Sequence, residues 1–157
     1  MFQEMRLNKR QVSREAAGDI LARGKYGVLS VNAQDDYGYG VPLSYVTRGD
    51  SIYLHCAREG KKLTLLRRNN RVSFCVVTEA EPLPGKFSMK YQSAMAFGKI
   101  HEVEDREEKL EALKALVKKY YRDPEVIAMG QEYAAASLDG TVVLRMDIEH
   151  LTGKARK

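Results

Sequence analysis

The chain is poor in the residues and motifs that most directly reveal chemistry. It has no tryptophan and only two cysteines, Cys56 and Cys75, which are too few for a disulfide framework and favour buried thiols. No cysteine–histidine pair has the spacing of metal ligands, so we expect no metal site. A glycine-rich dinucleotide fingerprint, a Walker loop and a nucleophilic serine or cysteine motif are also missing. Redox chemistry would therefore have to belong to a bound cofactor.

The sequence also lacks long apolar runs. No window approaches the roughly 18 consecutive apolar residues of a membrane span, and the first residues contain no run of signal-peptide length. We therefore expect a cytoplasmic protein without a membrane partner. Its 44% hydrophobic and 30% charged residues are typical of a globular protein, and its 157 residues predict one domain over residues 1–157.

A basic excess raises the question of a nucleic-acid partner. The net charge is +5, but the 26 basic residues are scattered among 21 acidic ones. The densest pairs, Lys61-Lys62 and Arg67-Arg68, share one short helical segment with leucines between them, and no nucleic-acid motif accompanies them. Because a small anionic ligand explains this charge as well as a polyanion does, we expect no nucleic-acid partner. Salt-dependent retention on DNA tests the alternative.

What the sequence does contain is a series of short β-patterns and amphipathic helices. Ser13 and Asp105 are predicted helix N-caps, and turns are predicted at 35–38 and at Gly49-Asp50. We expect a short helix after Gly60, helices at 13–23, 105–121 and 124–136, strands at 26–32, 39–47, 52–56, 72–78, 91–103 and 141–148, and a loop at 79–90. This order indicates an α+β, mainly β fold, an antiparallel closed or split β-barrel with peripheral helices.

The helix after Gly60 has an unusual start. Lys61 and Lys62 lie in or beside its first turn, where the macrodipole disfavours cations and backbone N–H groups lack partners. A phosphate between the lysines and the helix end would accept those N–H groups and two charge-assisted bonds. The alternative is a solvated basic turn, partly offset by Glu59.

Four segments of the chain follow one another in a characteristic order. They are Gly40-Val41-Pro42-Leu43-Ser44-Tyr45, His55-Cys56-Ala57 with Glu59-Gly60-Lys61-Lys62-Leu63, Tyr91-Gln92-Ser93-Ala94 leading to Gly98, and Leu151-Thr152-Gly153-Lys154. Together they resemble the pyridoxamine 5'-phosphate oxidase-like FMN-binding split-barrel family, and within it the nitroimidazole-resistance, or nitroimidazole-reductase, branch. The resemblance covers about residues 13–154. It implies non-covalent FMN at a homodimer interface and an oxidoreductase that passes electrons from NAD(P)H to a small planar acceptor such as a nitroaromatic.

The resemblance also implies roles for individual residues. Lys61 and Lys62 would hold the FMN phosphate, while residues 41–45 would present backbone groups to the edge of the ring. His55, the candidate catalytic residue, and Tyr91 would border the open face of the ring. The implied cofactor-binding set is Val41, Pro42, Leu43, Ser44, Tyr45, His55, Cys56, Ala57, Gly60, Lys61, Lys62, Tyr91, Ser93 and Ala94.

Several of these roles have structural alternatives. His55 could bond a neighbouring backbone group instead, and Tyr45, Tyr91 or Phe97 could fill the core rather than stack on a ring. Lys154 could reach the phosphate or the substrate, or belong to a frayed basic tail.

Two alternative functions keep the same fold. The first is a non-catalytic flavin-binding protein, which NAD(P)H oxidation with and without a nitro acceptor would separate from an enzyme. The second is a haem- or deazaflavin-binding member of the same superfamily. A haem would need an axial ligand such as His55, His101 or His150, and the visible spectrum of the purified protein decides between haem and flavin.

Overall fold

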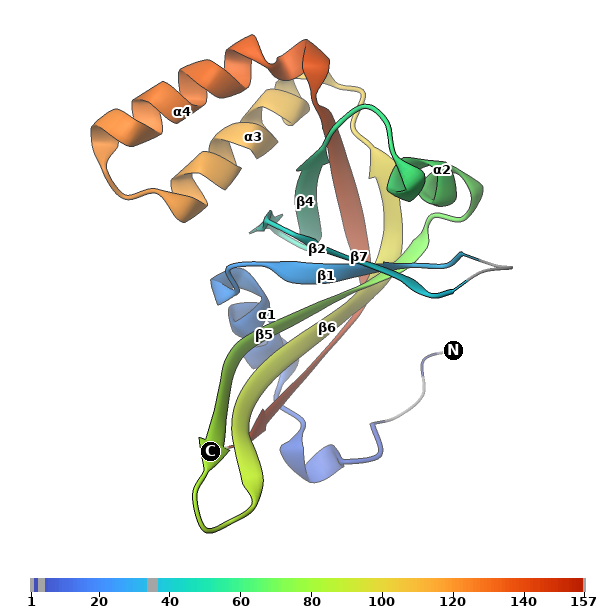
Figure 1. Cartoon of the computed structure of the whole chain (residues 1–157), viewed down its shortest axis with the longest axis vertical. Coiled ribbons are helices and arrows are strands. Elements are labelled where there is room, and N and C mark those ends of the chain that lie inside the picture. The colour runs from blue at the N-terminus through green and yellow to red at the C-terminus, as the bar shows by residue number, and fades with distance from the viewer. Residues whose placement is uncertain (1, 3–4, 34–36, 157) are drawn as a thin grey trace.

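The computed structural model describes Phe2, residues 5–33 and residues 37–156. Figure 1 shows α3 and α4 side by side at one end of the molecule and the long strands β5, β6 and β7 running toward the other. None of the helices in the described part is long and apolar enough to span a membrane. In chain order the elements are η1 (Asn8–Arg10), α1 (Arg14–Arg23), β1 (Gly27–Val31), β2 (Tyr39–Leu43), β3 (Tyr45–Arg48), β4 (Ser51–Cys56), α2 (Lys61–Arg68), β5 (Arg71–Leu83), β6 (Ser88–Glu102), α3 (Arg106–Tyr120), α4 (Pro124–Ala136), η2 (Leu138–Gly140) and β7 (Val142–Arg156).

The strands form one antiparallel sheet in the order β2-β1-β5-β6-β7-β4-β3. The two edges, β2 and β3, are neighbours in the chain, and no pairing joins them in the described sheet. This open seam confirms the predicted split antiparallel barrel with peripheral helices. The continuous strand predicted at 39–47 is wrong, because Ser44 lies between two strands and takes the chain from one edge of the sheet to the other. Pro42 is tolerated in β2 because an edge strand needs hydrogen bonds on one side only.

Two hydrophobic cores share strand β4. Ile52 and Leu54 point into the barrel, whereas Tyr53 points outward to α3. The barrel core also contains Leu29, Tyr45, Phe74, Val76, Ala96, Ile100 and Met146. The outer core contains Val103, Ala112, Leu113, Leu116, Ala134, Leu138 and Val143. The hairpin of α3 and α4 is therefore a second layer on the outside of the barrel wall.

The loop predicted at 79–90 is wrong. After a register shift between Val77 and Glu79, β5 and β6 continue to pair as far as Leu83 and Ser88. Pro82 fits in this extension because β5 pairs with β1 only as far as Cys75, so beyond that point one side of β5 needs no N–H. We call this part of the sheet, residues 77–95 with residues 151–156 of β7, the arm.

The last strand is also longer than predicted. Instead of ending at 148, β7 runs to Arg156 because the lengthened β6 offers it an edge, and Lys154 pairs with Ser93. The frayed-tail alternative for Lys154 is therefore wrong. Gly49, with a φ of 57°, turns the chain between β3 and β4 as predicted. The turn predicted at 35–38 includes residues 35 and 36, which lie outside the described residues.

Candidate functional site

A cavity of about 580 Å³ lies where the α3–α4 hairpin meets the end of β4 and the junction between β2 and β3. Strand alternation places His55 on the outer face of β4, the face that Tyr53 also uses. Ser44, at the seam of the barrel, lines the same cavity. The remaining lining comes from α3, α4 and their connection and includes Leu116, Tyr120, Tyr121, Met129 and Tyr133.

The helical wall of this cavity is fixed by capping and by close helix packing. The side chain of Asp105 accepts a hydrogen bond from the Glu108 N–H at the start of α3, and Asp123 accepts from the Glu125 N–H at the start of α4. Gly130 lets the helices approach, because a Cβ there would lie 2.7 Å from a methyl carbon of Val117. We call the end of β4 together with α2, α3 and α4 the helical end.

The surroundings of His55 favour its neutral form. Partial burial lowers the pKa of His55 from its usual value, and the nearby charge of Lys62 lowers it further. A neutral imidazole offers one N–H donor and one acceptor. His55 can therefore donate one hydrogen bond and accept another at the end of the cavity near pH 7.

The thiol of Cys56 faces the barrel side of β4, opposite His55. Burial raises the pKa of Cys56, and the side chain of Lys62, which hydrogen-bonds the sulfur, acts against that rise. Lys62 therefore lies close to both His55 and Cys56. The sequence predicted these three residues to belong to one site, and the structure brings them together.

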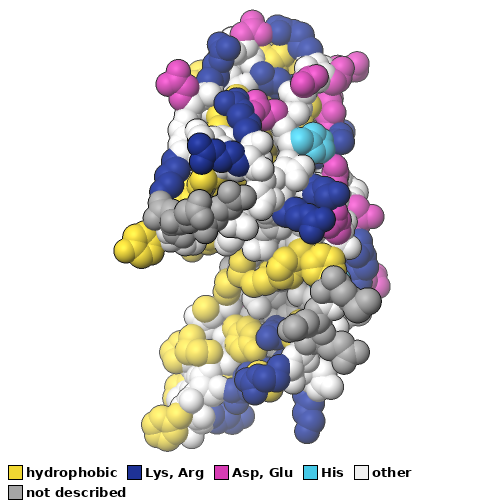
Figure 2. Space-filling model, turned by 90° about the vertical axis from the view of Figure 1, so that its right-hand side faces the viewer, with side chains coloured by type: hydrophobic (Ala, Val, Ile, Leu, Met, Phe, Trp, Pro, Cys, Tyr) yellow, Lys and Arg dark blue, Asp and Glu magenta, His cyan; other side chains and the backbone are white. Residues whose placement is uncertain are grey.

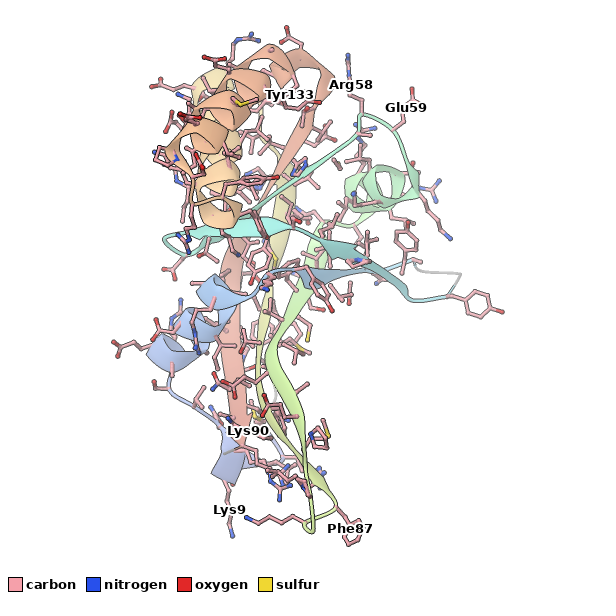
Figure 3. All side chains as sticks on the ribbon, turned by 60° about the vertical axis from the view of Figure 1, so that its left-hand side comes forward. Lys9, Arg58, Glu59, Phe87, Lys90 and Tyr133 are labelled. Carbon is pink, nitrogen blue, oxygen red and sulfur yellow. The ribbon has the colours of Figure 1, made fainter. Side chains whose placement is uncertain are left out.

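The start of α2 is built from Gly60 and the two predicted lysines. Gly60 has a φ of 140°, a conformation that side-chain-bearing residues rarely adopt, and no side chain caps this helix. The Lys61 ammonium lies 5.3 Å from the centre of the Tyr39 ring on β2. Figure 3 shows Arg58 and Glu59 at the tip of the preceding loop, which Ala57 begins. This basic helix start thus faces both β2 and the end of β4.

The predicted ring-edge residues of β2 lie on an edge strand. Val41 and Leu43 are partly buried, whereas Pro42 and Ser44 are exposed. Because β2 pairs only with β1, its other side is open to a ligand's hydrogen bonds.

Tyr45, by contrast, has its ring in the barrel core. It is fully buried, its hydroxyl donates to the Leu21 carbonyl, and its ring meets Phe74 edge to face at 4.8 Å. The Tyr45 N–H donates to the Tyr120 hydroxyl at 3.0 Å. Of the two interpretations of this side chain, core filling is therefore the one that the structure shows.

The remaining predicted residues lie on the arm. Ser93 and Ala94 of β6 line a second cavity of about 510 Å³ together with Lys154 of β7. The Tyr91 hydroxyl accepts a hydrogen bond from Arg10 at 3.4 Å. His55 pairs with Val143 and Ser93 with Lys154 on the same strand, so the two groups are about 35 Å apart along β7. One protomer therefore does not bring the predicted set into a single site.

The other two histidines lie outside the helical end. His101 Nδ1 is 3.8 Å from a carboxylate oxygen of Asp147. His150 stacks on Phe2, with ring centres 4.4 Å apart, in the cavity of the arm. Both therefore have protein partners that account for their positions.

Sequence reasoning missed the residues of α4. Met129 and Tyr133 line the cavity of the helical end, as does Val126, and Figure 3 labels Tyr133 on α4. Their spacing of three and four residues places them on one stripe of the helix. The signal that could have indicated these residues is a second apolar stripe on α4, beside the buried stripe of the same helix.

The open antiparallel sheet with its peripheral helices defines a class of proteins, the split β-barrel proteins. The family model described as pyridoxamine 5'-phosphate oxidase matches residues 13–155. The chain therefore belongs to the pyridoxamine 5'-phosphate oxidase family, as its motifs predicted. No curated protein matches the chain.

Solved structures agree with this assignment. A candidate 5-nitroimidazole antibiotic resistance protein from Bacteroides thetaiotaomicron is similar, with 25% identity, a TM-score of 0.79 and coverage of 92% of this chain and 85% of that one. An FAD-binding protein from Mesorhizobium loti has 24% identity, a TM-score of 0.69 and coverage of 94% and 98%. A flavocytochrome from Azotobacter vinelandii has 17% identity, a TM-score of 0.76 and coverage of 99% and 73%. The last two comparisons support the fold alone.

Proposed function

We propose that this protein is an FMN-dependent oxidoreductase that passes electrons from NAD(P)H to a small planar acceptor such as a nitroaromatic. The observation that carries the proposal is the basic start of α2, where Lys62 lies beside His55 and the seam of the barrel opens next to it. Family membership and the likeness to a candidate nitroimidazole-resistance protein support the same conclusion.

The chemistry of the site fits FMN. Lys61 and Lys62 match a terminal phosphate, and Gly60 leaves the start of α2 without a side-chain cap. The open side of β2 offers backbone donors and acceptors to the polar edge of a flat ring. FMN ends in one such phosphate, whereas in FAD the phosphates are internal and an adenosine follows. We therefore favour FMN over FAD.

The position of the arm supports a homodimer. Ser93 and Lys154 lie too far from Lys62 in one chain to share a small ligand with it. The arm also exposes Val77, Met89 and Met95. Figure 2 shows hydrophobic side chains gathered over the middle and lower parts of the molecule, while charged side chains dominate the upper part. We propose that a second copy covers this apolar surface and completes each flavin site.

In this proposal, the residues of the chain bind the FMN phosphate, orient the ring and hydrogen-bond the acceptor. When bound, FMN supplies the electron transfer. Lys61 and Lys62 hold the phosphate, and residues of β2 fix the plane of the ring through backbone groups. His55 stays neutral because its pKa is lowered, so it can donate one hydrogen bond to a bound acceptor.

The visible spectrum and the extracted cofactor of the purified protein test the proposal. We expect flavin absorption bands, release of FMN rather than FAD on denaturation, and NAD(P)H oxidation that nitrobenzene accelerates. A colourless protein that takes up no FMN at micromolar concentration would contradict the proposal, and a Soret band would indicate haem instead. FMN binding without NAD(P)H oxidation would indicate a non-catalytic flavin-binding protein.

A further inference from the structure

The cavity of the helical end has an aromatic wall that the proposed flavin contacts do not use. Tyr121, Met129 and Tyr133 border it and are 51%, 69% and 75% exposed. Exposure of three large side chains around one concave site is unfavourable in water unless a ligand covers them. Their position on α3 and α4 is also stable, because both helices are capped and packed on the outer core.

The distribution of polar groups in the cavity indicates what kind of ligand fits. Among the described residues that line it, none carries a carboxylate, an ammonium or a guanidinium group. Its polar groups are the tyrosine hydroxyls together with Ser44 and His55, which lie on the barrel side. A volume of about 580 Å³ is within the usual range for small-molecule pockets. The cavity therefore suits a flat, uncharged ring with a hydrogen-bonding group at one edge.

We propose that this cavity is the acceptor site, in which an aromatic ring lies against Tyr121, Met129 and Tyr133 and its polar edge meets His55 and Ser44. This assignment rests on the proposed function, because it identifies the site at which the second substrate of that enzyme binds. The tyrosine rings offer stacking partners, and the thioether of Met129 can adapt to rings of different shape. Met129 and Tyr133 are then specificity-determining residues, although they belong to none of the four family-like segments.

The test compares two nitro compounds that differ only in having a ring. Titration calorimetry of the protein as purified, without an electron donor, measures binding of nitrobenzene and of nitromethane. We expect nitrobenzene to bind and nitromethane to bind at least tenfold more weakly. Met129→Ala and Tyr133→Ala should each weaken nitrobenzene binding about tenfold, whereas Tyr133→Phe should retain it. The matched control is Tyr26→Ala, since Tyr26 is 63% exposed but does not line the cavity.

Each result has a definite meaning. Unchanged nitrobenzene binding in Met129→Ala and Tyr133→Ala overturns the assignment, and so does an absence of nitrobenzene binding. A parallel fall in FMN affinity also overturns it, because the residues would then belong to the flavin site. If the variants lose nitrobenzene binding while the wild type fails to oxidise NAD(P)H, the cavity stands as a binding site for aromatic rings and the proposed enzyme function fails.

Discussion

The helical end and the arm each hold part of the predicted flavin site, but they are built in opposite ways. At the helical end, Lys62, His55 and Cys56 come from neighbouring stretches of chain and meet within one protomer. On the arm, Ser93 and Lys154 face a separate cavity. The helical end is polar at the start of α2, whereas the arm exposes apolar side chains such as Met95.

Under the proposed function, this difference would make one protomer an incomplete flavin site. A phosphate site can be assembled locally, because a helix start and the preceding strand end are close in sequence. The residues proposed to contact the rest of the cofactor lie about 35 Å away along β7 in the same chain. The comparison therefore predicts that the two regions meet across a dimer interface. The predictions below test each region separately.

The largest expected effect comes from removing both lysines at the start of α2. A hydrogen bond to a charged group contributes about 1.5–3 kcal/mol, so each of Lys61→Ala and Lys62→Ala should weaken FMN binding roughly 10- to 150-fold. The double variant should lose more FMN affinity than either single variant. Apo stability should barely fall, because two cations leave the positive end of a helix dipole. Fluorescence quenching of FMN at fixed salt measures the affinity.

The matched control for the lysine variants is Arg68→Ala, at the favourable end of the same helix. It should leave FMN affinity unchanged. An unaltered affinity in the double lysine variant would show that the phosphate binds elsewhere.

The next effect should come from the arm. Met95→Glu places a charge on the exposed apolar surface of β6, and a buried unpaired carboxylate would oppose dimer formation. We expect light scattering to give the 17.8 kDa monomer, with FMN affinity lowered about tenfold or more. Tyr26→Glu, a similar change outside the arm, should remain a dimer. A dimer that persists in Met95→Glu would place the interface elsewhere.

Much of the fold could be predicted because its signals are local. Ser13 and Asp105 cap α1 and α3 as predicted, and Asp123 caps α4, whose range was also predicted. The arm could not be predicted, because Pro82 and the nearby glycine resemble a loop. Their compatibility with a strand depends on which side of β5 is paired, and that is a property of the whole sheet.

The candidate site could likewise be predicted only where its residues are close in sequence. Lys61, Lys62 and His55 could be grouped from the sequence because a few residues connect them. The sequence could not show that Tyr45 turns its ring into the core, since that depends on Leu21 and Phe74 from distant segments. Nor could the β6 motif show that its residues lie far from the lysines.

A smaller effect should come from Lys119, which lies between the barrel core and the helical end. Its ammonium is 3.5 Å from the centre of the Tyr45 ring and has no hydrogen-bond partner within the described part of the chain. Burial lowers the pKa of Lys119 from 10.5 to about 8. Lys119→Met should raise the free energy of unfolding at pH 7 by about 1 kcal/mol, a reduced value because the side chain is only half-buried.

The pH dependence of this stability gain tests whether the buried charge of Lys119 causes it. Between pH 8 and 10.5 the unfolded chain still holds the Lys119 proton while the folded protein has released it, so wild-type stability rises with pH through this range. The advantage of Lys119→Met should therefore be full at pH 7 and small at pH 10. Urea unfolding at both values measures it, with Lys118→Met on the exposed side of α3 as the control. An advantage independent of pH would contradict this explanation.

An effect of similar size should come from Glu108, which connects α3 to the outer face of the sheet. It accepts hydrogen bonds from the Tyr53 hydroxyl at 2.8 Å and from Arg145 at 2.7 Å, and these bonds lower the pKa of Glu108 below 4.5. A lowered folded-state pKa means that the stabilisation is complete above pH 4.5 and is lost as the pH falls through the folded value. Glu108→Gln should cost about 1 kcal/mol at pH 7, and its difference from wild type should shrink on acidification toward pH 3. Because Glu108 bonds to Tyr53 of β4 and Arg145 of β7, which are not among the proposed FMN contacts, FMN binding should stay unchanged. Urea unfolding at both pH values checks the stability, and a difference that persists at pH 3 would show that the carboxylate charge is not its source.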